Sequence, residues 1–189
     1  MKLYVIRHGQ SQTNLERRFT GWSQVPLTEK GIEDAKKIRP ILENVSFDRI
    51  FSSDLIRAMQ TAETALPGCS YETLPLIREI KMGSLEMMPI DEALPAIKEN
   101  NAGTLGYAMF GGESFVQFRA RIAEFLDMVK GLDCENVATF AHGGLLTTML
   151  SMVLGLDLRR GTVCCENCTV AVLDLKDGQW RLHSWINPL

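Results

Sequence analysis

The chain has 189 residues, of which 46% are hydrophobic and 23% are charged, and its formal net charge is −3. This composition is typical of a globular domain and excludes a general nucleic-acid-binding protein, which carries a basic stripe. No stretch approaches the roughly 18 apolar residues of a membrane span, and the first apolar run is too short for a signal peptide. We expect one domain, residues 1–189, in the cytoplasm, without nucleic-acid or membrane partners and with an oligomeric state that the sequence does not indicate.

The cysteines predict reduced thiols, because they are odd in number, irregularly spaced and not preceded by a signal peptide. They are Cys69, Cys134, Cys164, Cys165 and Cys168. The pair Cys165 and Cys168 is spaced like half of a zinc or redox site. A structural zinc site needs four ligands, however, and only His183 is left over as a further ligand. We interpret the pair as small apolar residues beside a strand and expect no metal.

The first predicted strand covers residues 3–6 and is apolar throughout, as in parallel sheets that are buried on both faces. It turns abruptly into Arg7, His8 and Gly9. In open α/β sheets, ligands bind at the carboxyl edge of the strands, and an arginine and a histidine there suit an anion. Taken alone, the stretch fits an ordinary solvated loop equally well.

A polar stretch without a clear period, residues 10–24, is expected to be a long loop. Thr28 then predicts the N-cap of a helix, in which Pro40 predicts a kink or an early stop. Residues 47–52 predict a second strand, and a helix follows from about residue 54 until Pro67 and Gly68 end it.

A weak strand is expected at residues 71–74. Prolines and glycines break the pattern over residues 76–112, which we interpret as a lid or insertion over the sheet that holds at most a short helix near residues 91–100. Ser114 and Gln117 then have the spacing of a capping box at the start of a clear helix.

The last third predicts a strand at residues 136–141, which breaks into His142 and a further helix. Two strand-like runs, residues 169–175 and 179–185, are joined by Asp177-Gly178 and predict a hairpin. Alternating strands and helices indicate a three-layer α/β/α fold, with a mostly parallel sheet and one antiparallel strand at the end.

Two of the three histidines, His8 and His142, occupy the same kind of place, directly after a buried strand and directly before glycine. If both strands lie in one parallel sheet, both imidazoles lie over one edge. Arg57 falls in the first turn of the helix after another strand and adds a second guanidinium to that of Arg7. Two arginines, two imidazoles and the N-terminus of the helix after His142 suit a phosphate group.

Arg7-His8-Gly9, with Asn14 downstream, resembles the signature of the histidine phosphatase superfamily, which includes the cofactor-dependent phosphoglycerate mutases. The resemblance covers nearly the whole chain, in six motifs in the expected order. The later motifs are Phe19-Thr20-Gly21 with Pro26-Leu27-Thr28, the stretch from Ser52 to Ala62, Ile77-Arg78-Glu79 with Gly83 and Glu86, Gly112-Glu113-Ser114, and Ala141-His142-Gly143-Gly144.

The resemblance implies a phosphoglycerate mutase-like fold and a role for each matching residue. His8 would be the nucleophile that forms a phosphohistidine, Arg7, Arg57 and His142 would hold the phosphoryl oxygens, and Glu79 would be the acid and then the base. Asn14, Thr20, Gly21 and Gly143 would contact phosphate or substrate. Neither a metal nor another cofactor is expected, since fixed cations would meet the developing charge.

The segment between residues 82 and 110 favours a phosphatase over a mutase, which must also grip a carboxylate and a second phosphate. Its only basic residue is Lys98, whereas it holds four acids and several methionines. We expect a small phosphorylated metabolite with a neutral or partly apolar leaving group, although packing explains the methionines at least as well. Leu85-Glu86-Met87 stands where the family often has Trp-Glu-Gly. The Glu86-Met87 pair together with a short lid is similar to α-ribazole phosphatases. A mutase and a non-catalytic relative that binds phosphorylated ligands remain the alternatives.

Overall fold

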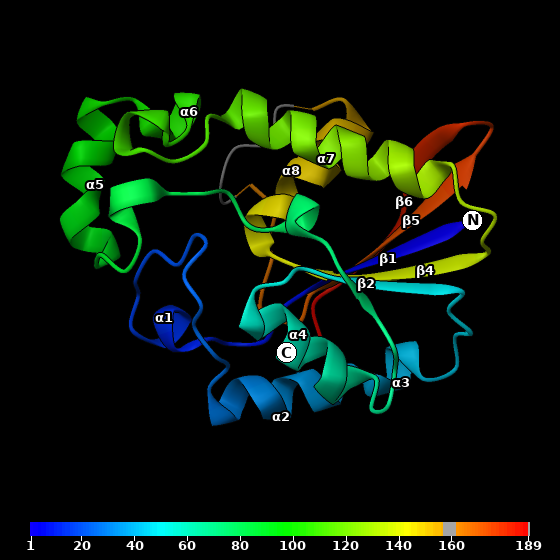
Figure 1. The fold of residues 1–189 in the computed structure, drawn as a ribbon. Coiled ribbons are helices and arrows are strands. Elements are labelled where there is room, and N and C mark those ends of the chain that lie inside the picture. The colour runs from blue at the N-terminus through cyan, green and yellow to red at the C-terminus, as the bar shows by residue number, and fades with distance from the viewer. Residues whose placement is uncertain (157–161, 189) are drawn as a thin grey trace.

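A six-stranded sheet forms the centre of the computed structural model, which describes residues 1–156 and 162–188 (Figure 1). The strand order is β3-β2-β4-β1-β5-β6. Strands β1 to β4 are parallel, and β5 is antiparallel to both of its neighbours. The predicted sheet with one antiparallel strand is therefore confirmed. The strands are β1 (Lys2–Arg7), β2 (Arg49–Ser52), β3 (Glu72–Thr73), β4 (Asn136–Ala141), β5 (Val170–Lys176) and β6 (Gln179–Ile186).

Helices cover both faces of the sheet, which confirms the three-layer α/β/α fold (Figure 1). The helices α2 to α4 lie on one face and α7 and α8 on the other. The α-helices are α1 (Gln12–Leu15), α2 (Glu29–Lys37), α3 (Arg39–Leu42), α4 (Ile56–Ala65), α5 (Ile90–Glu99), α6 (Ala102–Leu105), α7 (Phe115–Lys130) and α8 (Gly143–Leu154), and the short 3₁₀ helices are η1 (Pro75–Ile77), η2 (Gly83–Leu85) and η3 (Ala108–Phe110).

The inner part of the central strand β1 is apolar because each face of the sheet has its own core. Along β1, Leu3 and Val5 pack in the cluster under α7 and α8, whereas Tyr4 and Ile6 pack in the cluster under α2 and α4. Successive residues of a strand point to opposite faces, so a strand between two helical layers needs apolar side chains at every position.

The capping and turn signals of the sequence are confirmed. Thr28 caps α2 by accepting a hydrogen bond from the Gly31 amide at 3.0 Å, and Ser114 and Gln117 form a capping box at the start of α7. The expected break occurs at Ile38, between α2 and α3, and Pro40 lies in the first turn of α3. Asp177 and Gly178 have φ values of 53° and 74°, as a two-residue hairpin turn requires.

Two sequence expectations need correction. The polar stretch 10–24 holds the helix α1, which a capping box between Ser11 and Asn14 starts. Four residues are too few for a hydrophobic period, so the pattern could not reveal this helix. The segment 76–112 contains α6, η2 and η3 besides the expected helix, α5. Figure 1 shows α5 and α6 at the end of the molecule toward which the parallel strands point.

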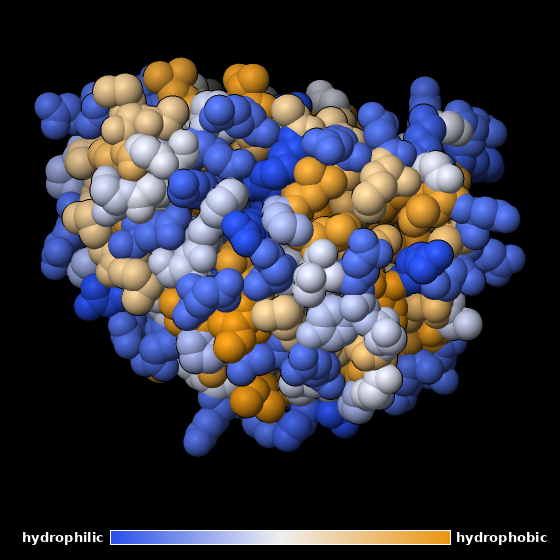
Figure 2. Space-filling model, viewed as in Figure 1, coloured by the Kyte–Doolittle hydropathy of each residue, from blue (hydrophilic) through white to orange (hydrophobic). Residues whose placement is uncertain are grey.

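The surface is mixed in character. Polar side chains cover most of the face seen in Figure 2, with apolar patches between them. Among residues 1–156 and 162–188, no helix is long and apolar enough to cross a membrane.

The loop after β1 packs directly on the first turn of α2, backbone against backbone. A Cβ atom on Gly31 would lie 2.1 Å from the carbonyl oxygen of Gln10, and one on Gly9 would lie 2.4 Å from that of Gly31. Neither backbone can move without shifting the loop that carries His8. The two glycines therefore set how closely α2 approaches this loop.

We predict that Gly31→Ala destabilises the fold by about 1–3 kcal/mol, because the new methyl group overlaps fixed backbone atoms. The sign of the change in stability is informative, since helix propensity alone favours alanine over glycine by up to about 1 kcal/mol and would stabilise the variant. The measurement is the free energy of unfolding in urea. Gly131→Ala is the matched control, because its Cβ would meet its nearest atom at an ordinary 3.5 Å. A Gly31→Ala variant as stable as the wild type would contradict the packing.

Candidate active site

The carboxyl ends of three parallel strands bring the predicted site residues together. His8 follows β1, His142 follows β4, and Arg57 is the second residue of the helix after β2. The His8 amide donates to the carbonyl oxygen of Ala141 at 3.0 Å, which extends the β1–β4 ladder to the histidine. The two imidazole centroids are 5.3 Å apart. The expectation that both histidines lie over one edge is therefore met by the geometry.

His8 is held in one neutral form by its neighbours. Its Nδ1 lies 2.6 Å from the carbonyl oxygen of Gly9, which only accepts, so Nδ1 carries the proton. Nε2 is then the acceptor for the Nε–H of Arg57 at 3.2 Å. The lone pair of Nε2 is thus turned toward the guanidinium of Arg57, where an anionic group would bind.

Arg57 is a buried cation, with 1% of its surface exposed. Besides His8, its guanidinium donates to the carbonyl oxygens of Gly21 at 2.9 Å and Ser23 at 3.0 Å. Burial lowers its pKa to about 10, while the charges of Glu79 and Glu86 act in the opposite direction. The guanidinium remains charged near neutral pH, and its hydrogen bonds to protein go to neutral acceptors.

Arg7 and His142 each present a buried nitrogen without a hydrogen-bond partner among the described residues, namely Arg7 Nε and His142 Nδ1. Arg7 is held at its other end, where Nη1 donates to the carbonyl oxygen of Cys165. A Cβ on Gly143 would lie 3.1 Å from Arg7 Nε, so the guanidinium lies against the N-terminus of α8. His142 Nε2 lies 2.8 Å from Ser53 Oγ, a bond that fixes the ring.

The pKa values of both histidines lie well below the ordinary value of 6.5. For His8 the causes are burial first, then the positive charges of Arg57 and Arg7. For His142 they are again burial and then Arg57, followed by His8 and Arg7. Both imidazoles are therefore neutral at pH 7, and burial contributes more to this than the arginines that the sequence pointed to.

Glu79 reaches the same edge from the segment after η1. Its Oε2 accepts from the Gly144 amide at 3.0 Å and its Oε1 from the Ile80 amide at 2.9 Å. A Cβ on Gly144 would lie 2.4 Å from Oε1, so only glycine leaves room for the carboxyl group. The indole Nε1–H of Trp22 donates to the Glu79 carbonyl oxygen at 2.7 Å.

The remaining predicted residues lie in the loops around His8. Asn14 Oδ1 accepts from Asn167 Nδ2 at 3.2 Å, and Nδ2 also donates to the His8 carbonyl oxygen at 3.0 Å. Thr20 Oγ1 lies 2.6 Å from Thr13 Oγ1. Gly21, at φ 49°, faces the carboxylate of Glu86 and offers its carbonyl oxygen to Arg57.

Sequence reasoning assigned no role to several residues that hold this arrangement. Ser53 fixes the His142 ring, and Gly144 and Trp22 hold Glu79. The guanidinium of Arg121 donates to the backbone of the Glu79 segment. A signal existed for Arg121, because it stands between the apolar positions 118, 122 and 125 of α7. Ser53 and Gly144 lie within the motifs and gave no separate signal.

The cysteine pair is incorporated into the two cores. Cys168 is fully buried in the cluster under α2 and α4, and Cys165 packs against the other cluster. Burial raises the pKa of the Cys168 thiol to about 12. In the part of the chain that the structure describes, no group of three or more histidine, cysteine or acidic side chains is arranged to hold a metal ion.

Known proteins resemble this chain in both sequence and fold. The family model of the histidine phosphatase superfamily (branch 1) matches residues 3–188. A probable phosphoglycerate mutase from Yersinia pestis is 32% identical, over 98% of this chain and 90% of that protein. The structure of a putative α-ribazole-5'-P phosphatase from Escherichia coli superposes with a TM-score of 0.87 at 25% identity, over 100% of this chain and 98% of the other.

A phosphoglycerate mutase structure from Bacillus anthracis superposes with a TM-score of 0.81 at 27% identity, over 97% of this chain and 92% of the other. The structural similarity thus extends to relatives described as phosphatases and to relatives described as mutases. The match of the family model to nearly every residue shows that the chain belongs to the histidine phosphatase superfamily (branch 1).

Proposed function

We propose that this protein is a phosphomonoesterase that hydrolyses a small phosphorylated metabolite through a phosphohistidine on His8. One observation carries the proposal: the neutral His8 ring has its proton on Nδ1 and its Nε2 lone pair turned toward the buried guanidinium of Arg57. A nucleophile held beside a fixed cation is what transfer of a dianionic phosphoryl group requires.

In the first step, Nε2 of His8 attacks phosphorus while the bond to the leaving oxygen breaks. Glu79, in its protonated form, gives its proton to that oxygen, so the alcohol leaves neutral. In the second step, water attacks the phosphohistidine and passes a proton to Glu79. The phosphorus–nitrogen bond breaks, its electron pair returns to Nε2, and inorganic phosphate leaves.

The charges of the site suit the equatorial oxygens of a phosphoryl group. Arg57 donates from one side, and Nε–H of Arg7 and Nδ1 of His142, which have no hydrogen-bond partner in the described part of the chain, supply further buried nitrogens. Gly143 begins α8, whose N-terminus adds a positive dipole end. In this proposal Asn14, Thr20 and Gly21 shape the surrounding loops and contact the substrate.

Phosphatase activity is favoured over mutase activity by the charges around the segment 82–110, which we propose to be a lid. The arginines that border it are engaged: Arg17 pairs with Asp91, and Arg78 pairs with Asp54, the latter with Nε 2.7 Å from Oδ1. Lys98, on α5, is exposed. Lys81 also lies beside the segment, with its Nζ 5.3 Å from the centroid of the Trp22 ring. Among the described residues, few cations are thus left for a second phosphate or a carboxylate, and we propose a neutral or partly apolar leaving group.

The mutase is the second candidate, because the relative from Yersinia pestis is described as a probable phosphoglycerate mutase. The structural match to the putative α-ribazole-5'-P phosphatase supports the first candidate and makes α-ribazole phosphate the substrate to test first. The proposed site of action is the cytoplasm, and no metal is needed for the steps above.

We predict that the protein releases p-nitrophenol from p-nitrophenyl phosphate and that His8→Ala lowers the rate by about 10³-fold or more, because the nucleophile is lost. Quenching with alkaline SDS during turnover with ³²P-labelled substrate should trap a base-stable, acid-labile phosphoenzyme in the wild type alone. A His8→Ala protein with undiminished turnover would contradict the proposal, and a wild type without turnover would favour a binding protein.

We predict that His8 stays neutral below pH 6.5, because burial and the charges of Arg57 and Arg7 lower its pKa. Proton uptake therefore begins in the unfolded state, and the folded state loses stability as the pH falls below about 6.5. With His142 behaving alike, the free energy of unfolding should fall by up to about 2.7 kcal/mol per pH unit. Histidine-ring NMR measures the titration and urea unfolding the stability.

Assignment of the rings uses the variants His8→Asn and His183→Gln, the second of which also serves as the control for stability. A His8 titration midpoint at or above 6.5 would show that the ring is not shielded in this way.

We predict that 3-phosphoglycerate with catalytic 2,3-bisphosphoglycerate yields no 2-phosphoglycerate, because the lid offers few cations to hold both acidic groups. The same preparation should hydrolyse at least one neutral-alcohol phosphate in a screen that includes α-ribazole phosphate. Products are measured by ³¹P NMR, with His8→Ala as the blank. Efficient formation of 2-phosphoglycerate would establish the mutase instead.

A further inference from the structure

Arg121 occupies an unusual place for a charged residue. It lies on α7 within the apolar stripe, next to the buried Phe118 and Ile122, and 14% of its side chain is exposed. Its guanidinium stacks over the Phe118 ring at 5.0 Å. A buried guanidinium is stable only where its donors are satisfied, so its partners show what it is for.

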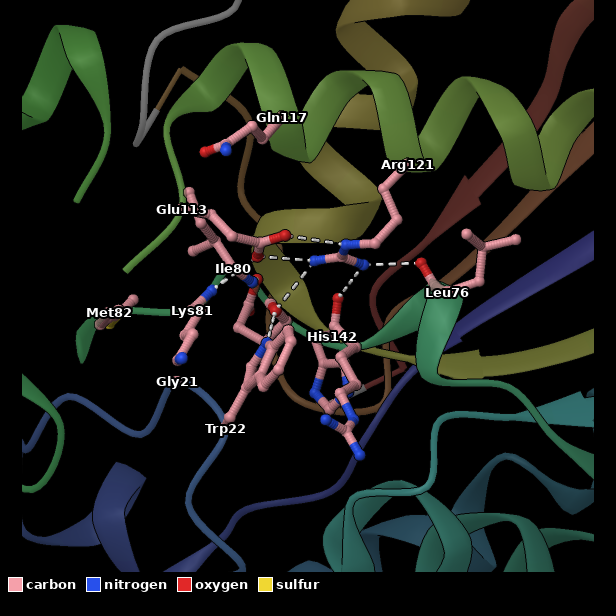
Figure 3. A network of polar contacts seen from close by, with 12 residues as sticks. Gly21, Trp22, Leu76, Ile80, Lys81, Met82, Glu113, Gln117, Arg121 and His142 are labelled. Atoms are coloured by element: carbon pink, nitrogen blue, oxygen red, sulfur yellow. Dashed lines mark hydrogen bonds and ion pairs between the residues drawn. The ribbon is translucent and has the colours of Figure 1, made fainter. Parts of the chain in front are cut away.

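Those partners are the backbone of the acid segment and one carboxylate (Figure 3). Nη1 donates to the carbonyl oxygens of Leu76 at 2.6 Å and Arg78 at 3.0 Å, and Nη2 donates to that of Glu79 at 3.2 Å. Nε and Nη2 also meet the two carboxylate oxygens of Glu113 at 3.0 and 2.9 Å. One side chain thus binds three carbonyl groups of four successive residues.

The carbonyl groups of Arg78 and Glu79 need such a donor because residues 78–82 are in neither helix nor strand, and that of Leu76 lies in the short 3₁₀ helix just before them. A buried carbonyl outside regular structure must find another donor, and a planar guanidinium supplies several in a fixed geometry. The indole of Trp22 approaches the Glu79 carbonyl from the other side. The backbone of Glu79 is therefore held between α7 and the loop that also binds Arg57.

Glu113 completes this support. Its carboxylate is 16% exposed, aligns the guanidinium of Arg121 in a two-pronged ion pair and accepts from the Lys81 amide at 2.8 Å. Its own amide donates to the Lys81 carbonyl oxygen at 2.9 Å. The pair Arg121–Glu113 therefore holds the chain on both sides of Glu79, at residues 76–79 and at residue 81.

The position of the Glu79 carboxyl group is tightly constrained by its neighbours. It is bonded by the amides of Ile80 and Gly144, and its oxygen lies where a Cβ on Gly144 would be. A shift of the Glu79 backbone therefore moves the carboxyl group relative to α8 and to the leaving oxygen of a substrate. A misplacement of about 1 Å can cost a reaction on the order of 10²-fold.

We propose that Arg121, aligned by Glu113, is a positioning residue that sets the acid Glu79 against the leaving group. This inference rests on the proposed function, in which Glu79 protonates that group. A positioning role can be told apart from a purely structural one, because displacement of the acid slows substrates with poor leaving groups more than substrates with good ones. Phenyl phosphate needs protonation of its leaving oxygen, whereas p-nitrophenol leaves well as the anion.

The experiment compares kcat/KM for the two substrates in the wild type, Glu79→Gln and Arg121→Lys. Lysine keeps the charge but offers at most three donors without the planar fork. Glu79→Gln should lose about 10²-fold or more with phenyl phosphate and far less with p-nitrophenyl phosphate. Arg121→Lys should show the same selective loss at about tenfold or more, a partial form of that effect.

Two further variants keep the outcome decisive. Arg119→Lys makes the same exchange at an exposed position two residues earlier on α7 and should leave both rates unchanged. Glu113→Gln keeps the shape of the carboxylate, loosens the alignment of Arg121 and should reproduce the selective loss if Arg121→Lys does not fold. In the background of Glu79→Gln, Arg121→Lys should add no further selectivity, because the acid is already absent.

Equal losses with both substrates in Arg121→Lys and Glu113→Gln would overturn the inference and leave a structural role. If Glu79→Gln itself lost equally with both substrates, the acid assignment of the proposed function would fail instead. The two failures are thus distinguished within one set of measurements.

Discussion

The site depends on one buried charge, the guanidinium of Arg57, whose hydrogen bonds to protein go to neutral acceptors. Withdrawing a cation from water is costly unless its donors are satisfied, and here two loop carbonyls and His8 Nε2 accept three of the five N–H groups. The same charge contributes to the low pKa values of both histidines. A bound phosphate would supply the missing negative charge. The neutral form of His8 and the proposed affinity of the site for an anion therefore have a common origin.

Much of this could be predicted from the sequence because the elements obey local rules. Two-sided burial made the central strands β1 and β4 largely apolar. The carboxyl ends of parallel strands share one edge, so His8, Arg57 and His142 could be placed together before their distances were known. Thr28 and Asp177-Gly178 carried their own cap and turn chemistry. The helix α1 was missed, because one capping box between Ser11 and Asn14 creates it without any apolar period.

The groups that support the site were harder to predict, because their partners are backbone atoms. Arg121 binds three carbonyl oxygens, Trp22 binds one, and Gly144 matters through the space that its missing side chain leaves. The identity of a residue does not show whether its carbonyl group lies outside regular structure or whether there is room for a Cβ atom. The available signal was indirect: a charged residue inside the apolar stripe of α7 must have buried partners.

The loop around Trp22 joins the two halves of the proposed chemistry. The carbonyl oxygens of Gly21 and Ser23 hold Arg57, which faces the nucleophile, and the Trp22 indole holds the backbone of Glu79. Ser23 Oγ also donates to Glu86 at 3.1 Å, which ties the loop to the segment 82–110. Residues 21–23 thus contact Arg57, the backbone of Glu79 and Glu86 at once, and the proposed phosphate-binding, acid and lid groups are connected through them. In the proposed mechanism, a change in the segment 82–110 that displaces this loop would therefore disturb the nucleophile and the acid as well as the choice of leaving group.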